Sequence, residues 1–321
     1  MIYPVCVIGG GSAGVMSVLR TVLNNDDCLF FPGTAKDKKK SRALWVRKVE
    51  NIPAHLNYKR GIEEPNAETL KWISESAFKE RLHMHKNIGV TSLKKNGELF
   101  DIIDSKGEKH QAKYVVLCTG VMDVQPIIKG SIETVFDYAN AQTIDYCLIC
   151  DGHHVLGKKA GVIGHTNSAA WIAIMLYERY QWPLVIFTNG EKSEFSEDTS
   201  KLISHYGIQV KTSVIKEIHG EEKGKILKAL ELEGETVPVD IVFVALGMIV
   251  YNELAVEAGA AIDERGFVKT DDTGLTNVAG LYVAGDLRAN AKKQIYTAWD
   301  QAVSSCNSIN QKLRQEKRPK L

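Results

Sequence analysis

The residues with the clearest chemical potential are two cysteines three positions apart, Cys147 and Cys150, followed directly by Asp151. Cysteines at this spacing can close a small, reducible disulfide, and each thiol stabilises the thiolate of the other. A carboxyl group beside a departing thiolate can give or take its proton. The motif therefore predicts a redox-active disulfide, with Cys147 and Cys150 as the redox pair and Asp151 as the acid/base group.

Two other interpretations of the cysteine pair stay open at this stage. His153 and His154 follow closely and could complete a zinc site with the pair. However, the chain has no second CxxC, and the histidines stand too near the pair for zinc-finger spacing. The pair could also be structural and buried. The two histidines either favour the Cys147 thiolate when protonated or are exposed loop residues, and we assign no metal-binding residue.

A glycine motif near the N-terminus predicts a dinucleotide site. Gly9, Gly11 and Gly14 follow an apolar run at 2–8 and precede a helical pattern at 15–23. Glycines at this spacing let the backbone approach a pyrophosphate, and the helix N-terminus offers free N–H groups. The acidic residue expected about 20 positions later, to bind the ribose, is absent. A bound dinucleotide must hold its adenosine end differently, and the alternative is a glycine-rich turn without a ligand.

A second strand, turn and helix begin at 159, but the glycine motif in this turn is damaged. Thr166 stands at the position of the second glycine and adds a side chain where a pyrophosphate would lie. The next strand ends in 187–191 (FTNGE), which has no arginine for a 2′-phosphate and has an acid that would repel one. This pattern favours a nucleotide-type scaffold that no longer binds NADPH.

The two glycine motifs indicate an α/β fold with two doubly wound, three-layer, Rossmann-like domains, the second inserted in the first. We expect the first domain at 1–122 and 251–321, and the inserted domain, with the cysteine pair, at 123–250. Gly120 and Gly247 are the expected hinges. Further strands are predicted at 114–117, 241–246 and 280–286, and a closing helix at 298–313.

The composition excludes several classes of protein. The 321 residues include 40 Lys and Arg against 39 Asp and Glu, and a net charge of +1 argues against binding to nucleic acid or to an anionic membrane. The longest apolar run, 241–250, is about half the length of a membrane span, and no signal peptide is evident. Six scattered cysteines are typical of a cytosolic chain. We expect a cytoplasmic, globular protein.

A basic cluster at 36–48 contains seven cations and one acid, Asp37. Such a cluster is usually a solvated loop, but beside the first glycine motif it could clamp phosphates or attract an acidic protein. The cations are Lys36, Lys38, Lys39, Lys40, Arg42, Arg47 and Lys48.

Five segments together resemble the low-molecular-weight thioredoxin reductases, and they span nearly the whole chain. In order, the segments are 9–14 (GGGSAG), 49–53 (VENIP), 118–120 (CTG), 147–152 (CLICDG) and 280–286 (GLYVAGD) with 293–295 (KQI). The resemblance implies a homodimer and an FAD held in the first domain. It also implies that the disulfide of the inserted domain faces the flavin, with Cys150 nearer the isoalloxazine.

The resemblance further implies a substrate class and a set of cofactor contacts. The substrate would be a dithiol or a disulfide, either a protein such as a thioredoxin or a small molecule. The FAD contacts expected from the matching motifs are Gly9, Gly11, Ser12, Ala13, Gly14, Asn51, Thr119, Gly120, Gly285, Asp286, Gln294 and Ile295.

The chain departs from the family pattern at positions that bear on its cofactors. Thr166 and 188–189 replace the elements for NADPH, and Tyr296 and Trp299 add bulk where the family has small residues. Such changes are similar to those in branches that do not use NADPH: ferredoxin-linked flavin reductases, dithiol oxidases, and diflavin-linked disulfide oxidoreductases with a second FAD. We favour the last, because Trp299, Tyr296 or Trp45 can stack on an additional ring.

We therefore expect an FAD-dependent disulfide oxidoreductase that relays electrons between the flavin and the Cys147–Cys150 pair without NADPH, while Asp151 moves the proton. The direction depends on the redox potentials of donor and acceptor. Two alternatives are an NADPH-dependent thioredoxin reductase that tolerates Thr166, and a flavin- or zinc-binding redox sensor without turnover.

Overall fold

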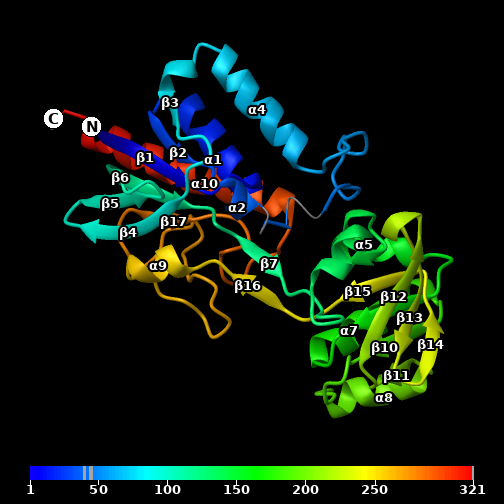
Figure 1. Ribbon diagram of the computed structural model, residues 1–321. Helices are drawn as coiled ribbons and strands as arrows, with labels where there is room; N and C mark the ends of the chain where they lie inside the picture. The colour runs from blue at the N-terminus through cyan, green and yellow to red at the C-terminus, as the bar shows by residue number, and fades with distance from the viewer. Residues whose placement is uncertain (39–40, 43–45, 320–321) are drawn as a thin grey trace. The chain divides into compact units, whose positions relative to one another are not determined.

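The computed structural model describes residues 1–38, 41–42 and 46–319, and its chain divides into two compact units (Figure 1). Unit 1 comprises 1–44, 60–122 and 250–321, and unit 2 comprises 45–59 and 123–249. Most of unit 2 is thus one long insertion in the chain of unit 1. None of the described helices is both long enough and apolar enough to cross a membrane.

The described part of unit 1 is built around a sheet of seven strands. They are β1 (Ile2–Ile8), β2 (Cys28–Phe31), β3 (Leu82–Met84), β4 (Val90–Asn96), β5 (Leu99–Asp104), β6 (Lys109–Leu117) and β17 (Leu281–Val283). Their order is β3-β2-β1-β6-β5-β4, and β17 also pairs with β6. The pairs that join β3, β2, β1, β6 and β17 are parallel, whereas β4 and β5 extend the sheet in antiparallel fashion.

Both faces of this sheet are buried. Alternate residues of a strand point to opposite faces, so Val5 and Val7 lie in one buried cluster, and Cys6 and Ile8 lie in the other. The first cluster also contains residues of α1 and α10, and the second contains residues of α9. The helices of unit 1 are α1 (Ser12–Leu23), α2 (Ala35–Lys38), α4 (Glu63–Glu75), α9 (Glu253–Glu257) and α10 (Ile295–Glu316).

The described part of unit 2 contains a five-stranded parallel sheet and a three-stranded antiparallel sheet. The parallel sheet is formed by β8 (Ile144–Asp145), β9 (Ala160–Ile163), β10 (Leu184–Phe187), β11 (Gln209–Lys211) and β15 (Ile241–Val244), in the order β11-β10-β9-β15-β8. The antiparallel sheet is formed by β12 (Ile215–Glu221), β13 (Ile226–Leu232) and β14 (Glu235–Pro238). Helices α5 (Phe136–Asn140), α6 (Leu148–Asp151), α7 (Asn167–Tyr180) and α8 (Glu197–His205) complete the unit.

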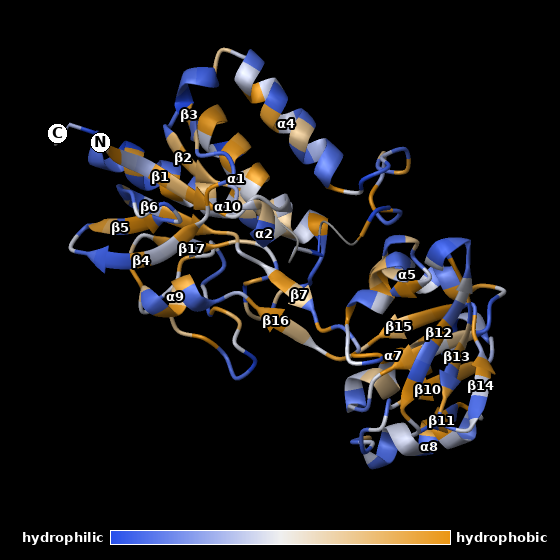
Figure 2. Ribbon diagram, in the orientation of Figure 1, coloured by the Kyte–Doolittle hydropathy of each residue, from blue (hydrophilic) through white to orange (hydrophobic). Residues whose placement is uncertain are grey.

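The parallel sheet of unit 2 lies between two layers. One face packs on α7 and α8, in a buried cluster that includes Ile186 and Phe243. The other face packs on the antiparallel sheet, in a cluster that includes Phe187 and Val242. Strands buried on both faces read as continuous apolar runs, and Figure 2 shows β10 and β15 as predominantly hydrophobic. The parallel sheets of both units confirm the expected α/β class with two Rossmann-like modules.

The chain enters the insertion through one short strand and leaves it through another. These are β7 (Val121–Asp123) and β16 (Met248–Val250), which pair with each other. Gly120 and Gly247 directly precede them and have φ angles of +68° and +92°, a region that glycine adopts without strain. Their hinge role stays a prediction.

The expected domains differ from the compact units at 45–59 and at Val250, which groups with unit 1. The segment 45–59 is expected in the first domain, whereas its described part groups with unit 2. The cause is long-range pairing: Arg47 Nε donates to Asn140 Oδ1 at 3.2 Å, and Glu50 Oε2 lies 2.8 Å from His154 Nε2. Partners this far apart in the chain leave no local sequence signal. The remaining domain boundaries stay a prediction.

Candidate active site

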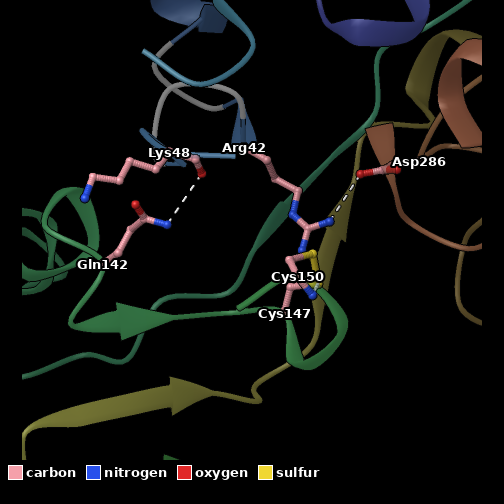
Figure 3. Close-up of a disulfide and its surroundings, with 6 residues drawn as sticks. All are labelled: Arg42, Lys48, Gln142, Cys147, Cys150 and Asp286. Atoms are coloured by element: carbon pink, nitrogen blue, oxygen red, sulfur yellow. Dashed lines mark hydrogen bonds and ion pairs between the residues drawn. A yellow bond between two sulfur atoms is a disulfide. The ribbon is translucent and has the colours of Figure 1, made fainter. Parts of the chain in front are cut away.

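The cysteine pair forms a disulfide at the start of a short helix. The sulfur atoms of Cys147 and Cys150 are bonded, and their Cα atoms lie 5.3 Å apart (Figure 3). Cys147 directly precedes α6, and its sulfur accepts the Cys150 N–H at 3.1 Å. Both cysteines are half-buried, and the next residue, Asp151, is buried. The predicted disulfide is therefore confirmed, and the acid/base role of Asp151 stays a prediction.

The other four cysteines lie in the core of unit 1. Cys6, Cys28, Cys118 and Cys306 are buried and form no disulfide. Burial raises the pKa of each of these thiols, which disfavours the thiolate that reacts. These four thiols are therefore poorly suited to thiol–disulfide exchange.

A network of two histidines and two carboxylates adjoins the disulfide in sequence. The Glu50 Oε2 atom lies 2.9 Å from His153 Nε2 and 2.8 Å from His154 Nε2. The other ring nitrogen of His154, Nδ1, lies 2.8 Å from Oδ2 of Asp145, which is buried. The sequence favours His154 as a loop residue or a thiolate stabiliser, but the structure pairs it with two carboxylates.

These contacts shift the proton affinities in the network. The hydrogen bond to Asp145, followed by the one to Glu50, raises the pKa of His154 to about 9 against the opposing effect of burial. Hydrogen bonds from His154 and His153 lower the pKa of Glu50. The negative charge of Asp151 also favours protonated His154, so the acid/base candidate and this network are electrostatically linked.

The first glycine loop leaves open space at one glycine, Gly11, and excludes a side chain at the other glycines. A Cβ at Gly9 would lie 2.2 Å from the Cys118 carbonyl oxygen, and one at Gly14 would lie 1.8 Å from the Gly9 carbonyl oxygen. Both glycines are thus required for packing. At Gly11, by contrast, no described atom lies within 4 Å of a built Cβ. Gly11 therefore keeps open space at the start of α1.

The start of α1 suits an anion. Gly11 precedes the helix without capping it through a side chain, and the described first turn contains no acidic residue. The first N–H groups of a helix lack partners within the helix and lie at the positive end of its dipole. Ser12, Ala13 and Gly14 form the first turn, so these predicted contacts lie with Gly11 at this helix end.

Two further predicted segments lie beside the glycine loop. The Cys118 N–H donates to Ile8 O at 2.7 Å, so Thr119 and Gly120 follow β6 next to the end of β1. Gly285 packs against Ala13, because a Cβ at Gly285 would lie 2.9 Å from the Ala13 Cβ. The Thr119 hydroxyl itself donates to the Tyr251 carbonyl at 2.6 Å.

The last predicted contacts lie between β17 and α10. The Gly285 N–H donates to Oε1 of buried Gln301 at 2.8 Å, and this bond ties the turn after β17 to α10. Gln294 is buried directly before α10, and Ile295 begins the helix. Asn51 is also a predicted contact, but its segment belongs to unit 2, whereas the other predicted contacts belong to unit 1.

Asp286 carries an ion pair that the sequence did not reveal. Arg42 Nη1 lies 3.2 Å from Asp286 Oδ2, and both side chains are mostly buried (Figure 3). In the sequence, Arg42 is distinguished only as one of the cations in the basic cluster. Lys39 and Lys40 of that cluster, and the stacking candidate Trp45, lie outside the described residues. Within unit 1, Arg42 therefore neutralises a carboxylate that is expected to meet the cofactor.

Lys293 is a second residue that sequence reasoning missed. Its Nζ donates to the Arg288 carbonyl at 2.6 Å and lies 3.9 Å from the centre of the Phe267 ring. Burial lowers the pKa of Lys293 to about 8, although the charge of Asp286 acts in the opposite direction. The side chain directly before Gln294 is thus a cation that loses its proton in mildly alkaline solution.

The second glycine motif is built for packing. A Cβ at Gly164 would lie 2.7 Å from the Ala245 carbonyl oxygen, so this first glycine is required by the fold. Thr166 occupies the position directly before α7. Beyond β10, the Thr188 hydroxyl donates to the Glu191 carbonyl, and Asn189 Oδ1 accepts the Ile215 N–H. The side chains at 188–189 are therefore engaged in local structure.

A family model described as pyridine nucleotide-disulphide oxidoreductase matches residues 3–302. The chain belongs to this family. It is 27% identical over 306 residues to the thioredoxin reductase of Mycoplasmopsis pulmonis, covering 92% of this chain and 93% of that protein. It is 28% identical over 303 residues to the thioredoxin reductase of Treponema pallidum, covering 92% of each chain. Membership of the family makes this protein a flavin-dependent disulfide oxidoreductase.

Solved structures support the fold. The putative thioredoxin reductase TrxB of Bacillus anthracis superposes with a TM-score of 0.83 at 22% identity, covering 98% of this chain and 100% of that chain. The structure named HlmI gives a TM-score of 0.83 at 20% identity, covering 98% of this chain and 93% of that chain. At such identities the likeness concerns architecture alone.

The residues of unit 1 fit the flavin of this family. FAD, when bound, accepts or donates an electron pair. The open space at Gly11 and the uncapped start of α1 suit its pyrophosphate. The polar residues expected to orient the rest of the cofactor, Asp286 and Gln294, lie in the same unit.

We predict that Gly11→Ala and Gly14→Ala will separate cofactor binding from folding. Gly11 has a φ of −78°, which alanine also adopts, so its methyl group fills the ligand space without harming the chain. We expect Gly11→Ala to lower the flavin content roughly tenfold while the FAD-free protein keeps its melting temperature. Gly14→Ala should lower both the flavin content and the melting temperature, because the added Cβ overlaps the backbone of the loop. Undiminished flavin in purified Gly11→Ala would contradict this assignment.

We predict that the Lys293 amine titrates with a midpoint near pH 8. Because its pKa is lowered in the folded state, protonated Lys293 opposes folding, and its contribution to stability improves as the pH rises from about 8 to the ordinary lysine value of about 10.4. Competitive acetylation followed by mass spectrometry gives the pH profile of this amine, with a lysine in a short peptide as the reference. A profile that coincides with the reference would refute the shift.

Proposed function

We propose that this protein passes two electrons between FAD and the Cys147–Cys150 disulfide, and that it uses an electron donor or acceptor other than NADPH. The observation that carries the relay is the disulfide on α6 with buried Asp151 directly after it. Four buried thiols elsewhere are kept protonated, which supports a single redox pair.

The chain's own residues supply the proton chemistry of this relay. Reduction of the disulfide breaks the S–S bond and adds two electrons and two protons, and oxidation of the dithiol reverses both changes. Cys150 is the sulfur that we assign to the flavin side, and Cys147 exchanges with the substrate. Asp151 holds the proton that the departing thiolate needs, and one residue can serve in both directions.

Residues of unit 2 support the proposal that the electron donor or acceptor is not NADPH. Thr166 adds a side chain before α7, where a pyrophosphate would otherwise approach the helix. Thr188 and Asn189 bond to backbone groups, and Glu191 would repel a 2′-phosphate. The family name and the relatives named thioredoxin reductase keep NADPH use as the competing outcome of the test.

The relatives support a partner class for the dithiol. Because they are named thioredoxin reductases, we propose a thioredoxin-like protein or a small disulfide as the substrate. We further propose a homodimer that works in the cytoplasm, where thiol–disulfide exchange proteins are kept reduced.

The relay predicts which cysteine is essential. Cys150→Ser should abolish dithiol-dependent flavin reduction, whereas Cys306→Ser, the same change at a buried cysteine outside the pair, should leave it intact. Both variants and the wild type are mixed anaerobically with dithiothreitol and, separately, with NADPH, and the flavin absorbance is followed. Reduction of the flavin of Cys150→Ser by dithiothreitol would disprove the relay. Rapid bleaching of wild-type flavin by micromolar NADPH would disprove only the proposal about the donor.

The number of flavins separates the branches of the family. Tyr296 is exposed and Trp299 half-buried on the first turns of α10, just beyond Gln294, and either ring can stack on a second isoalloxazine. We therefore expect two flavins per chain, measured from the absorption spectrum of the purified protein after denaturation. One flavin per chain would exclude the diflavin branch and leave the relay itself standing.

A further inference from the structure

We propose that Glu50, His153 and His154 of unit 2 form a binding site for one divalent metal ion of the zinc class. From the sequence, no metal site is expected, because the histidines stand close only to the cysteine pair. The structure supplies a different third ligand, Glu50, from more than 100 positions earlier in the chain.

The three side chains already converge on a small volume. One oxygen or nitrogen atom of each lies within 4.8 Å of the others. Glu50 Oε2 lies 2.8 Å from His154 Nε2 and 2.9 Å from His153 Nε2. Tetrahedral zinc with bonds of about 2.0–2.1 Å separates its ligand atoms by about 3.3–3.4 Å. The carboxylate therefore needs to retreat by only about half an ångström to admit the ion.

A buried carboxylate stands behind one of the ligands. His154 Nδ1 contacts Oδ2 of Asp145 at 2.8 Å, and Asp145 is 3% exposed. Metal-binding histidines usually donate their second ring N–H to a carboxylate, which fixes the tautomer and raises the basicity of the ligating nitrogen. Asp145 therefore directs Nε2 of His154 toward Glu50 and the proposed ion.

The ligand set and its exposure indicate the type of ion. Two imidazoles and one carboxylate suit zinc and its transition-metal neighbours, whereas magnesium and calcium prefer oxygen ligands alone. The side chains of His153 and Glu50 are 49% and 33% exposed, so an ion can enter from solvent. Three protein ligands leave a fourth position for water or for an atom of a partner.

A second cluster of the same unit provides a comparison. Glu217, His219 and Glu231 also converge, but this cluster offers a single imidazole. The side chains of His219 and Glu231 are both more than 40% exposed. His219→Ala is therefore a suitable control. It removes an exposed histidine of unit 2 that is also paired with a glutamate, Glu231.

Occupation of the site would link two parts of unit 2. Glu50 belongs to the segment at 46–59, and the histidines belong to the turn that follows α6 and the disulfide. A metal would join the two through coordinate bonds in place of hydrogen bonds. It would also bring a divalent charge near Asp151, which already interacts electrostatically with His154.

The test measures metal content of the full-length flavoprotein. Protein stripped with a chelator is dialysed against Zn²⁺ or, separately, Mg²⁺, and metal per chain is measured by mass spectrometry. We expect one Zn²⁺ and no Mg²⁺ in the wild type, in His219→Ala and in the Cys147→Ser/Cys150→Ser double variant. We expect the Zn²⁺ affinity of His153→Ala and Glu50→Gln to fall roughly tenfold or more, and that of Asp145→Asn to fall roughly 10–100-fold.

His153 and Glu50 are exposed enough for their variants to fold, and circular dichroism checks this. Three results would overturn the proposal. The first is that the wild type retains no Zn²⁺. The second is that the Zn²⁺ affinity of both His153→Ala and Glu50→Gln is unchanged. The third is that, among the variants, only the double cysteine variant loses Zn²⁺. The last result would assign the metal to the cysteine pair.

Discussion

The close approach of the first glycine loop to neighbouring backbone is the constraint on which unit 1 depends. Gly9 and Gly14 bring the end of β1 and the start of α1 so near to each other and to Cys118 that one methyl group at either position would collide with a carbonyl oxygen. This contact aligns the ends of β1, β6 and β17, the edge where parallel sheets of this type bind ligands. The apolar clusters on both faces then hold the strands in place.

Two glycine turns with similar backbone contacts differ at the position of the second glycine. In both, the first glycine is fixed by contact with the backbone of a neighbouring strand's end, Cys118 for Gly9 and Ala245 for Gly164. Only the first turn also keeps an open glycine position before its helix. In both modules, therefore, the first glycine is required by packing, whatever stands at the position of the second glycine.

The sequence was sufficient wherever the signal is local. The strand, glycine turn and helix of each module, and the disulfide of Cys147 and Cys150, follow from neighbouring residues, and the structure contains them. The ends of elements were less accurate. The predicted strand 280–286 is limited to β17, because Gly285 adopts a φ of +86°, and the helix predicted from 298 begins at Ile295.

Long-range contacts could not be predicted from the sequence. Glu50 acquires its histidine partners across 103 and 104 positions, and Arg42 acquires Asp286 across 244. Lys293 likewise meets the ring of Phe267 only in the folded chain. In each case the residue type is visible in the sequence, but its electrostatic environment is created by tertiary structure.

The burial of Cys6, Cys28, Cys118 and Cys306 has a practical consequence for the cell and for the bench. Because their thiols are shielded and protonated, thiol-directed reagents and oxidants can reach only Cys147 and Cys150 on the folded protein. If one sulfur of the α6 pair is removed, the other becomes the sole accessible point for covalent trapping. A mixed disulfide isolated with such a protein would therefore report a genuine exchange partner at one defined atom.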